Sequence, residues 1–491
     1  MKKHPLSRRL AAALAGVALL AGAAGAQPPS PWPQPRPQPS EPTFARNVPN
    51  FHAPSATQCA RPVLTREIPG APAHPQGRHH EAESLARAAP AGRVLEDRAR
   101  PGSAPGAAAR AMPAPPPAPV PAPVAPSTAR ESGPAHDPAP QQQWPSAPPL
   151  VTAGVVDDNA DFSAYLAFRD RTQVDHRPRD VRQRHLLQVR DPRGRPVGDA
   201  EVAVQGASGY TMWARTDTGG RAWLHPDAFD PLRSHAYQVR VRKDGAQAWA
   251  RLDRGQKSAV EVTLDAAPPA PRARLDLVFL VDATGSMADE IDKLKATLRT
   301  ITAEVAALPS RPDICLGLVA YRDHGDAFLL RSHDLSNDVG AFLQQALYPL
   351  RAGGGGDTPE AMSEALHETV HQLSWRGDGT TRLVILLADA PPHLDYGAPH
   401  YDDDMLAALG KGIKIFGVGA SGLDRQGEFI QRQLAQYTGG KFVFLTYADA
   451  RRPGSGPGRE TVHDVNNYSV DSLDRLVVRL VREELALAGS R

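Results

Sequence analysis

The sequence predicts three parts: a doubly wound, mainly parallel α/β domain, a smaller all-β sandwich before it, and a disordered, proline-rich N-terminal region. Three observations lead to this fold class. Of the 49 prolines, 32 lie within the first 150 of the 491 residues. Apolar residues alternate with a period of two between residues 182 and 265, which is typical of short strands. Beyond residue 272, apolar strand-like runs alternate with helical patterns, as in a parallel sheet that helices cover on both faces.

Residues 1–26 have the features of a secretory signal peptide. A basic start is followed by a Leu/Ala/Gly run and by the small-x-small cleavage motif Ala24-Gly25-Ala26. We therefore expect an exported protein that is periplasmic, on the cell surface or secreted. No second apolar run reaches membrane-spanning length, so we expect no integral membrane segment in the mature chain.

The next two segments are predicted to connect rather than to form a core. Residues 27–150 are rich in Pro, Ala, Arg and Gln, a composition that favours polyproline II and buries little apolar area. We expect a disordered linker there, with a docking segment for an aromatic-lined groove as the alternative. Residues 151–180 are predicted to be a short helical connector, in which Asp161 caps a helix that carries Tyr165 and Phe168.

Residues 181–267 are predicted to form an Ig-like β-sandwich. Its short strands are separated by turn signals such as Asp217-Thr218-Gly219-Gly220. Two stretches, Asp191 to Val202 and Thr216 to Ala222, resemble the start and the second turn of carboxypeptidase regulatory-like modules. That resemblance implies a spacer or binding role.

The α/β domain is expected over residues 272–488. It opens with a buried strand at 275–281 and a helix at 288–308, whose apolar residues recur at spacings of three and four. Further strands are predicted at 314–321, 382–387, 413–418 and 441–445. Further helices are predicted at 339–350, 359–372, 403–409, 426–438 and 470–487.

Oxygen-bearing side chains gather in three loops of this domain. Asp282, Thr284 and Ser286 follow the first strand, Thr358 follows a run of four glycines, and Asp389 closes a later strand. Because the carboxyl ends of parallel strands meet at one edge of a sheet, these side chains can converge. Two carboxylates and three hydroxyls suit a hard divalent cation.

This pattern resembles the metal-ion-dependent adhesion site (MIDAS) of the von Willebrand factor A domain. That site combines an Asp-x-Ser-x-Ser loop, a Thr in a second loop and an Asp in a third; here Thr284 replaces the first Ser and keeps the oxygen. The third loop, Asp389-Ala390-Pro391-Pro392-His393, and the stretch Tyr321 to Asp326 resemble the branch found in hemicentins and alpha-kinase-linked A domains. The implied metal ligands are Asp282, Thr284, Ser286, Thr358 and Asp389.

The resemblance also implies a function. The metal would be Mg²⁺, with Mn²⁺ or Ca²⁺ as alternatives, since Mg²⁺ keeps waters that a ligand can replace. Neutral hydroxyls leave the ion's charge largely uncancelled, so an open position would attract an Asp or Glu of a partner protein. We therefore expect an adhesion or assembly protein and not an enzyme. The alternative is a structural scaffold, either stabilised by metal or independent of it.

A second motif leaves a less favoured alternative, a metal-assisted hydrolase. His367-Glu368-Thr369-Val370-His371 matches the His-Glu-x-x-His pattern, in which two histidines bind zinc and the Glu is the general base. No third ligand is evident from the sequence, and the same helix carries an apolar stripe suited to packing on the sheet. We therefore expect His367 and His371 on a solvated polar flank.

Two polar groups after the third loop receive ordinary interpretations. We expect Asp402 or Asp403 to cap the next helix, where negative charge favours the helix dipole. We expect His393 and His400 to be solvated residues at the rim of the site.

Charge and cysteine content exclude other classes. A formal net charge of +2 argues against a general nucleic-acid binder. Two distant cysteines, Cys59 and Cys315, exclude a Cys-based zinc or iron–sulfur site. Cys315 lies in a strand-like run, so we expect a buried thiol that packs as an apolar group. A Cys59–Cys315 bridge in an oxidising compartment is the alternative.

Overall fold

The computed structural model describes residues 64–70, 150–266, 272–377 and 379–487. The predicted signal peptide and almost all of the predicted linker lie outside the described residues. None of the described helices is both long enough and apolar enough to cross a membrane.

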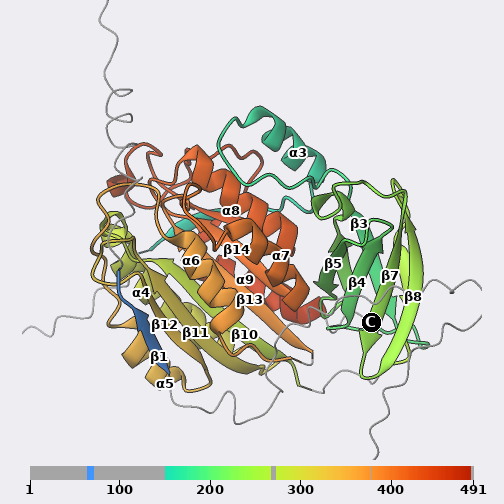
Figure 1. Cartoon of the computed structure of the whole chain (residues 1–491). Coiled ribbons are helices and arrows are strands. Elements are labelled where there is room, and N and C mark those ends of the chain that lie inside the picture. Colours follow the sequence, from blue (N-terminus) through green and yellow to red (C-terminus); the bar gives the residue numbers. More distant parts are fainter. Residues whose placement is uncertain (1–63, 71–149, 267–271, 378, 488–491) are drawn as a thin grey trace, which may run out of the picture. The chain divides into compact units, whose positions relative to one another are not determined.

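A nine-stranded mixed sheet forms the centre of the C-terminal domain (Figure 1). Its five central strands are parallel, as the sequence predicts, and the strands at its two edges are antiparallel. In spatial order the strands are β1 (Thr65–Ile68), β12 (Leu330–Ser336), β11 (Asp313–Tyr321), β10 (Arg274–Asp282), β13 (Thr380–Ala388), β14 (Ile413–Gly419), β15 (Phe442–Thr446), β2 (Thr152–Val156) and β16 (Val470–Ser472).

Helices cover both faces of this sheet. Along β10, Leu277 and Phe279 belong to one apolar core, while Val278 and Leu280 belong to the other. A strand buried on both faces needs apolar residues at successive positions, which is why β10 reads as a continuous apolar run. One core includes residues of α4 (Ala288–Ala306), the π-helical η3 (Phe342–Leu347) and α9 (Leu473–Ala486). The other includes residues of α6 (Met362–His367), the π-helical η4 (Glu368–Gln372), α7 (Tyr401–Lys411) and α8 (Arg425–Thr438).

Four strands of the sheet, β1, β2, β12 and β16, come from segments in which the sequence predicts no strand. Strand β1 lies within the stretch expected to be a linker and pairs with β12. Strand β2 lies within the expected helical connector and pairs with β15 and β16. Both strands have only four or five residues, so their backbone pairing leaves little apolar pattern in the sequence. The expected helix follows as α3 (Phe162–Arg171), and Asp161 caps it by accepting a hydrogen bond from the Ala164 N–H at 3.0 Å.

Residues 185–263 form two smaller sheets. The first is three-stranded, with β6 (Arg221–Leu224), β3 (His185–Arg190) and β9 (Val260–Thr263). The second is four-stranded, with β5 (Thr211–Arg215), β4 (Glu201–Gly206), β7 (Ala236–Lys243) and β8 (Ala246–Asp253). Inward-facing residues of both sheets, such as Leu187 and Val239, are fully buried in one shared cluster. The period-two alternation within residues 182–265 comes from pairs such as Leu187 and Val189 or Val202 and Val204. It lies in β3, β4, β7 and β9 and did not indicate the other three strands.

The smaller sheets contact the α/β domain at the amino-terminal edge of its central strands. Asp199 lies 3.0 Å from Arg382 on β13 and accepts a hydrogen bond from the Gly379 N–H at 2.8 Å. Nearby, the His225 ring stacks on Tyr437 of α8, with centroids 4.6 Å apart. Charge pairing and ring stacking therefore join the two regions along this edge.

Cys315 is not the free thiol that the sequence analysis favours. It is buried on β11 and is disulfide-bonded. The sequence has one other cysteine, Cys59, which lies outside the described residues. A strand-like sequence predicts burial but carries no information about a distant partner, which is why the prediction was wrong.

Candidate metal centre

The first loop of the predicted site leaves the carboxyl end of β10. Asp282 is fully buried and its Oδ1 accepts two hydrogen bonds, from the Thr284 N–H at 3.0 Å and from Thr284 Oγ1 at 2.7 Å. Ser286 Oγ lies 3.1 Å from Thr284 Oγ1. The chain then enters a short 3-10 turn, η2 (Gly285–Met287), and α4. The turn therefore brings three oxygen-bearing side chains of the motif together.

Asp389 reaches the same place from the neighbouring strand. Strands β10 and β13 are parallel and adjacent, with Val281 opposite Leu387, so both chains leave the sheet side by side. Asp282 Oδ2 and Asp389 Oδ1 are both buried and neither accepts a hydrogen bond. Burial, and then the Asp389 carboxylate, raise the pKa of Asp282 to about 7, and burial raises the pKa of Asp389. Two unpaired carboxylate oxygens in a buried place fit a bound cation, which would offset their charge.

The glycine-rich loop packs directly against the first loop. The Gly285 N–H donates to the Gly354 carbonyl at 2.9 Å, and the Gly353 N–H donates to the Ala283 carbonyl at 3.1 Å. Gly354 has a φ of +73°, and a Cβ there would collide with the Asp326 carboxyl group. Glycine is therefore required for this close approach.

Thr358 lies farther along this loop and is exposed. Its hydroxyl makes no hydrogen bond with any residue that the structure describes. The structure thus brings four of the five predicted ligands together and places Thr358 on the adjoining loop. The ligand role of all five residues stays a prediction. Ser286 is exposed as well, so this side of the cluster opens to solvent.

Three further acidic or phenolic groups surround the site and were not singled out from the sequence. Glu360 is buried, its Oε2 accepts no hydrogen bond, and burial followed by the Asp282 charge raises its pKa to about 10. Burial also raises the pKa of Glu290, on the first turn of α4, to about 7. Tyr321, at the end of β11, is buried and its pKa lies well above the ordinary value, first because of burial and then because of Asp282. Glu360 follows Thr358 by two positions, and this closeness in the sequence was the signal that could have placed Glu360 near the site.

The residues after the third loop differ from expectation. His393 is buried, with Nε2 3.0 Å from Asp323 Oδ1 and its ring stacked on Tyr396 at 3.9 Å, so it is not a solvated rim residue. Helix α7 begins at Tyr401 with His400 at the N-cap position, so neither Asp402 nor Asp403 caps it. Both aspartates pair instead with Arg179, at 2.6 and 2.9 Å. A distant arginine competes here with a local capping role.

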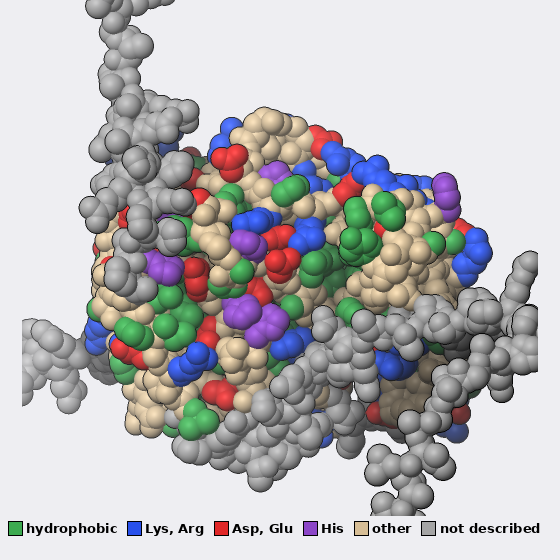
Figure 2. All heavy atoms as spheres, viewed as in Figure 1, with side chains coloured by type: hydrophobic (Ala, Val, Ile, Leu, Met, Phe, Trp, Pro, Cys, Tyr) green, Lys and Arg blue, Asp and Glu red, His purple; other side chains and the backbone are tan. Residues whose placement is uncertain are grey.

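The His-Glu-x-x-His motif lies on α6 and η4, on another part of the surface. Figure 2 shows histidine and acidic side chains exposed close together over α6 and α7. Glu368 is buried and faces away from the two histidines. Its Oε1 accepts from Ser332 Oγ at 2.8 Å, and its Oε2 lies 3.0 Å from Arg66 of β1. Because these contacts fix Glu368, the geometry does not offer it as the general base of a hydrolase.

Comparison with known proteins agrees with this fold. Residues 276–446 match the model of the von Willebrand factor type A domain, so this part of the chain is an A domain with a doubly wound α/β fold. The alpha-protein kinase vwkA of Dictyostelium discoideum is 32% identical over 120 residues, which cover 24% of this chain and 19% of the kinase. An ariadne-like RING finger protein, R811, of Acanthamoeba polyphaga mimivirus is 32% identical over 122 residues, covering 25% of this chain and 12% of that protein. The matches thus span less than a fifth of either relative's length.

A solved structure is similar to part of the chain. The pilus adhesin SpaC from Lactobacillus rhamnosus GG, in its open conformation, is 17% identical with a TM-score of 0.25. The match covers 42% of this chain and 29% of the adhesin.

Proposed function

We propose that the A domain binds a partner protein by capturing one of its Asp or Glu side chains through a divalent metal ion, in the first place Mg²⁺. Asp282, Thr284, Ser286, Thr358 and Asp389 would hold the ion. The observation that carries this proposal is the pair of buried carboxylate oxygens, Asp282 Oδ2 and Asp389 Oδ1, that accept no hydrogen bond. Such groups are costly in an apolar interior unless something charged pairs with them.

The chain's own residues prepare this site for binding rather than for chemistry. Thr284 fixes the orientation of the Asp282 carboxylate through two hydrogen bonds, and the packed glycine loop holds the first loop in place. A bound Mg²⁺ would supply positive charge and an exchangeable water position that a carboxylate can take. Exposed Ser286 and Thr358 leave one side of the site accessible to a partner.

Capture of an acidic side chain can be tested with peptides displayed on the full chain. We expect selection in Mg²⁺ to enrich peptides that EDTA releases and that lose binding when one Asp or Glu becomes Asn or Gln. Asp282→Asn should lose them, while the matched control Asp292→Asn, whose side chain is exposed on α4, should keep them. Peptides that bind equally in EDTA and to Asp282→Asn would instead favour a scaffold role.

We further propose that the chain is exported, with residues 1–26 as its signal peptide and 27–150 as a linker. The two smaller sheets would then be a carboxypeptidase regulatory-like β-sandwich that acts as a spacer. The disulfide at Cys315 supports export, because such bonds persist in oxidising compartments. Mass spectrometry of the natural protein should find Gln27 as its N-terminus and a peptide that joins both cysteines. An intact Met1 with two free thiols would contradict export.

A further inference from the structure

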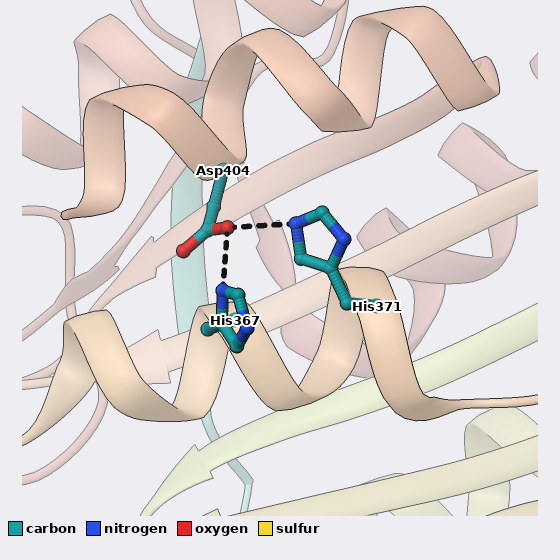
Figure 3. Close-up of side chains that lie close together, drawn as sticks. All are labelled: His367, His371 and Asp404. Atoms are coloured by element: carbon teal, nitrogen blue, oxygen red, sulfur yellow. Dashed lines mark hydrogen bonds and ion pairs between the residues drawn. The ribbon is translucent and has the colours of Figure 1, made fainter. Parts of the chain in front are cut away.

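Two histidines, on α6 and η4, and one aspartate, on α7, lie close together between the two neighbouring helices (Figure 3). Asp404 Oδ1 lies 3.0 Å from His367 Nδ1 and 2.9 Å from His371 Nε2. Both imidazole rings point toward the same carboxylate, and the three candidate ligand atoms all lie within 4.8 Å of one another. This cluster does not overlap with the five residues of the proposed MIDAS.

The backbone holds the two histidines as a pair. Helix α6 ends at His367 and continues as a π-helical turn, η4, which carries His371. The two rings lie 4.5 Å apart, centroid to centroid. Beside them Leu366 and Val370 are fully buried in the core that also contains residues of α7, so the backbone that carries the imidazoles is anchored. Irregular π-turns of this kind are often retained at functional sites.

Asp404 is the feature that points to a ligand. Its side chain is 4% exposed, and its second oxygen, Oδ2, is buried and accepts no hydrogen bond. No lysine or arginine within the described ranges forms an ion pair with it, whereas the neighbouring Asp402 and Asp403 both pair with Arg179. The nearby Lys411 donates instead to the Val370 carbonyl at 2.6 Å. Asp404 therefore carries unused acceptor capacity beside two nitrogen ligands.

We propose that His367, His371 and Asp404 bind a divalent transition-metal ion of the zinc class. Two imidazoles and one carboxylate form a ligand set that suits Zn²⁺, and three protein ligands leave a fourth position for water or an external group. The histidine side chains are 44% and 33% exposed, so the ion can enter from solvent. Binding requires His367 Nδ1 and His371 Nε2 to be free of protons, so each neutral imidazole would carry its one proton on the other ring nitrogen.

The metal would fasten two helices and not cut a peptide bond. Histidines on α6 and η4 and an aspartate on α7 become one coordination unit, in which the aspartate lies 33 or more positions after either histidine in the chain. Glu368, the residue that a hydrolase needs as its base, is held by Ser332 and Arg66 on the opposite side. The site is thus a structural or regulatory metal site, and it is independent of the proposed MIDAS.

Titration of the EDTA-stripped full chain with Zn²⁺ against a chromophoric competitor tests this site. We expect the H367Q/H371Q variant to bind one equivalent fewer than the wild type, or to bind that equivalent at least about a hundredfold more weakly. Co²⁺ should give the wild type visible ligand-field bands that the double variant lacks. H400Q, which changes a nearby histidine outside the cluster, and D282N should both keep the bands.

The outcomes separate this site from adventitious binding by other histidines. Equal Zn²⁺ stoichiometry and equal Co²⁺ spectra for the wild type and H367Q/H371Q would overturn the proposal. Far-UV circular dichroism checks that the double variant is folded. If it is not, H371Q alone carries the same comparison, because that side chain is one-third exposed.

Discussion

Buried aspartates have opposite surroundings at the amino and carboxyl ends of the central strands of the nine-stranded sheet. Near the amino end of β10, the fully buried Asp276 accepts from Arg376 Nε at 2.6 Å and from the Arg376 N–H at 2.8 Å. Asp282, at the carboxyl end of the same strand, is just as buried but has no arginine or lysine partner among the described residues. Its neighbour there is a second carboxylate, Asp389.

We call the amino ends of the central strands the paired edge and their carboxyl ends the unpaired edge. The paired edge serves the fold, and the unpaired edge is suited to a ligand. A buried aspartate whose charge is already balanced by an arginine has no free charge with which to bind a ligand. A buried pair of like charges is unfavourable until a cation arrives, and in open α/β sheets ligands bind at the carboxyl ends of the strands. The contacts with the smaller sheets, Asp199 with Arg382 and His225 with Tyr437, lie at the paired edge.

Removing the charge of Asp276 should have the largest effect. Asp276→Asn leaves the buried Arg376 without its main partner and is expected to lower the free energy of unfolding by about 3–5 kcal/mol. Urea denaturation measures this loss. Asp313→Asn is the matched control, since Asp313 contacts the same arginine at 3.0 Å but is 36% exposed. A control that costs as much as Asp276→Asn would contradict the role given to burial.

The same substitution at the other end of β10 should act with the opposite sign. In EDTA at pH 8, Asp282→Asn is expected to raise the free energy of unfolding by about 4 kcal/mol. The reason is that the unfolded carboxyl group loses its proton near its ordinary pKa of 3.8, whereas the folded one keeps it up to about 7. Above pH 7 the folded state therefore bears the cost of a buried charge. A loss of stability in urea denaturation would show that this carboxylate is already well paired.

A substitution of Thr358 tests whether the glycine-rich loop supplies a ligand to the metal site at the unpaired edge. Thr358→Val should weaken Mg²⁺ binding about tenfold, because it removes one neutral ligand oxygen. The stability of the metal-free protein should not change, since the side chain is exposed and makes no hydrogen bond within the described part of the chain. Calorimetric titration of the wild type and of Thr358→Val with Mg²⁺ gives the ratio of their dissociation constants. Equal dissociation constants would remove Thr358 from the ligand set.

The paired edge should also show a pH dependence through His225. Burial, and then the nearby Arg184 and His185, lower the pKa of His225 to about 3. Below pH 6.5 the His225 imidazole binds a proton in the unfolded state but stays neutral in the folded state. The free energy of unfolding therefore falls as the pH drops through this range. We expect His225→Phe, which keeps a ring against Tyr437, to reduce the loss between pH 7 and 5.5 by about 1 kcal/mol. Parallel pH profiles of the two proteins would contradict a neutral, buried His225.

Local features of the A domain could be predicted from the sequence, and non-local ones could not. The apolar run of β10 and the loop from Asp282 to Ser286 are contiguous, so period and motif were enough to place them. Asp404 joins His367 and His371 only because α6 packs beside α7, and no spacing in the sequence shows this. The cap prediction failed for the same reason, since Arg179 lies more than 200 positions before Asp402.

The antiparallel strands β1 and β12 were missed because their sequences carry neither a continuous nor an alternating apolar pattern. Strand β12 reads Leu-Arg-Ser-His-Asp-Leu-Ser, yet Ser332 and His333 are buried. Strand β1 is mostly exposed and is held by backbone pairing with β12 and by the ion pair between Arg66 and Glu368. These contacts also explain why Glu368 could not be read correctly from its motif alone.

The most direct test of the unpaired edge is isothermal titration of the EDTA-stripped full chain with Mg²⁺, beside Asp282→Asn and the control Asp292→Asn. We expect the wild type and Asp292→Asn to bind one ion each that Asp282→Asn does not bind. Saturation at a hundredfold excess over the dissociation constant should then stabilise the first two proteins by about 2.7 kcal/mol. Equal Mg²⁺ binding by all three proteins, or none by a folded wild type, would contradict a metal site between Asp282 and Asp389.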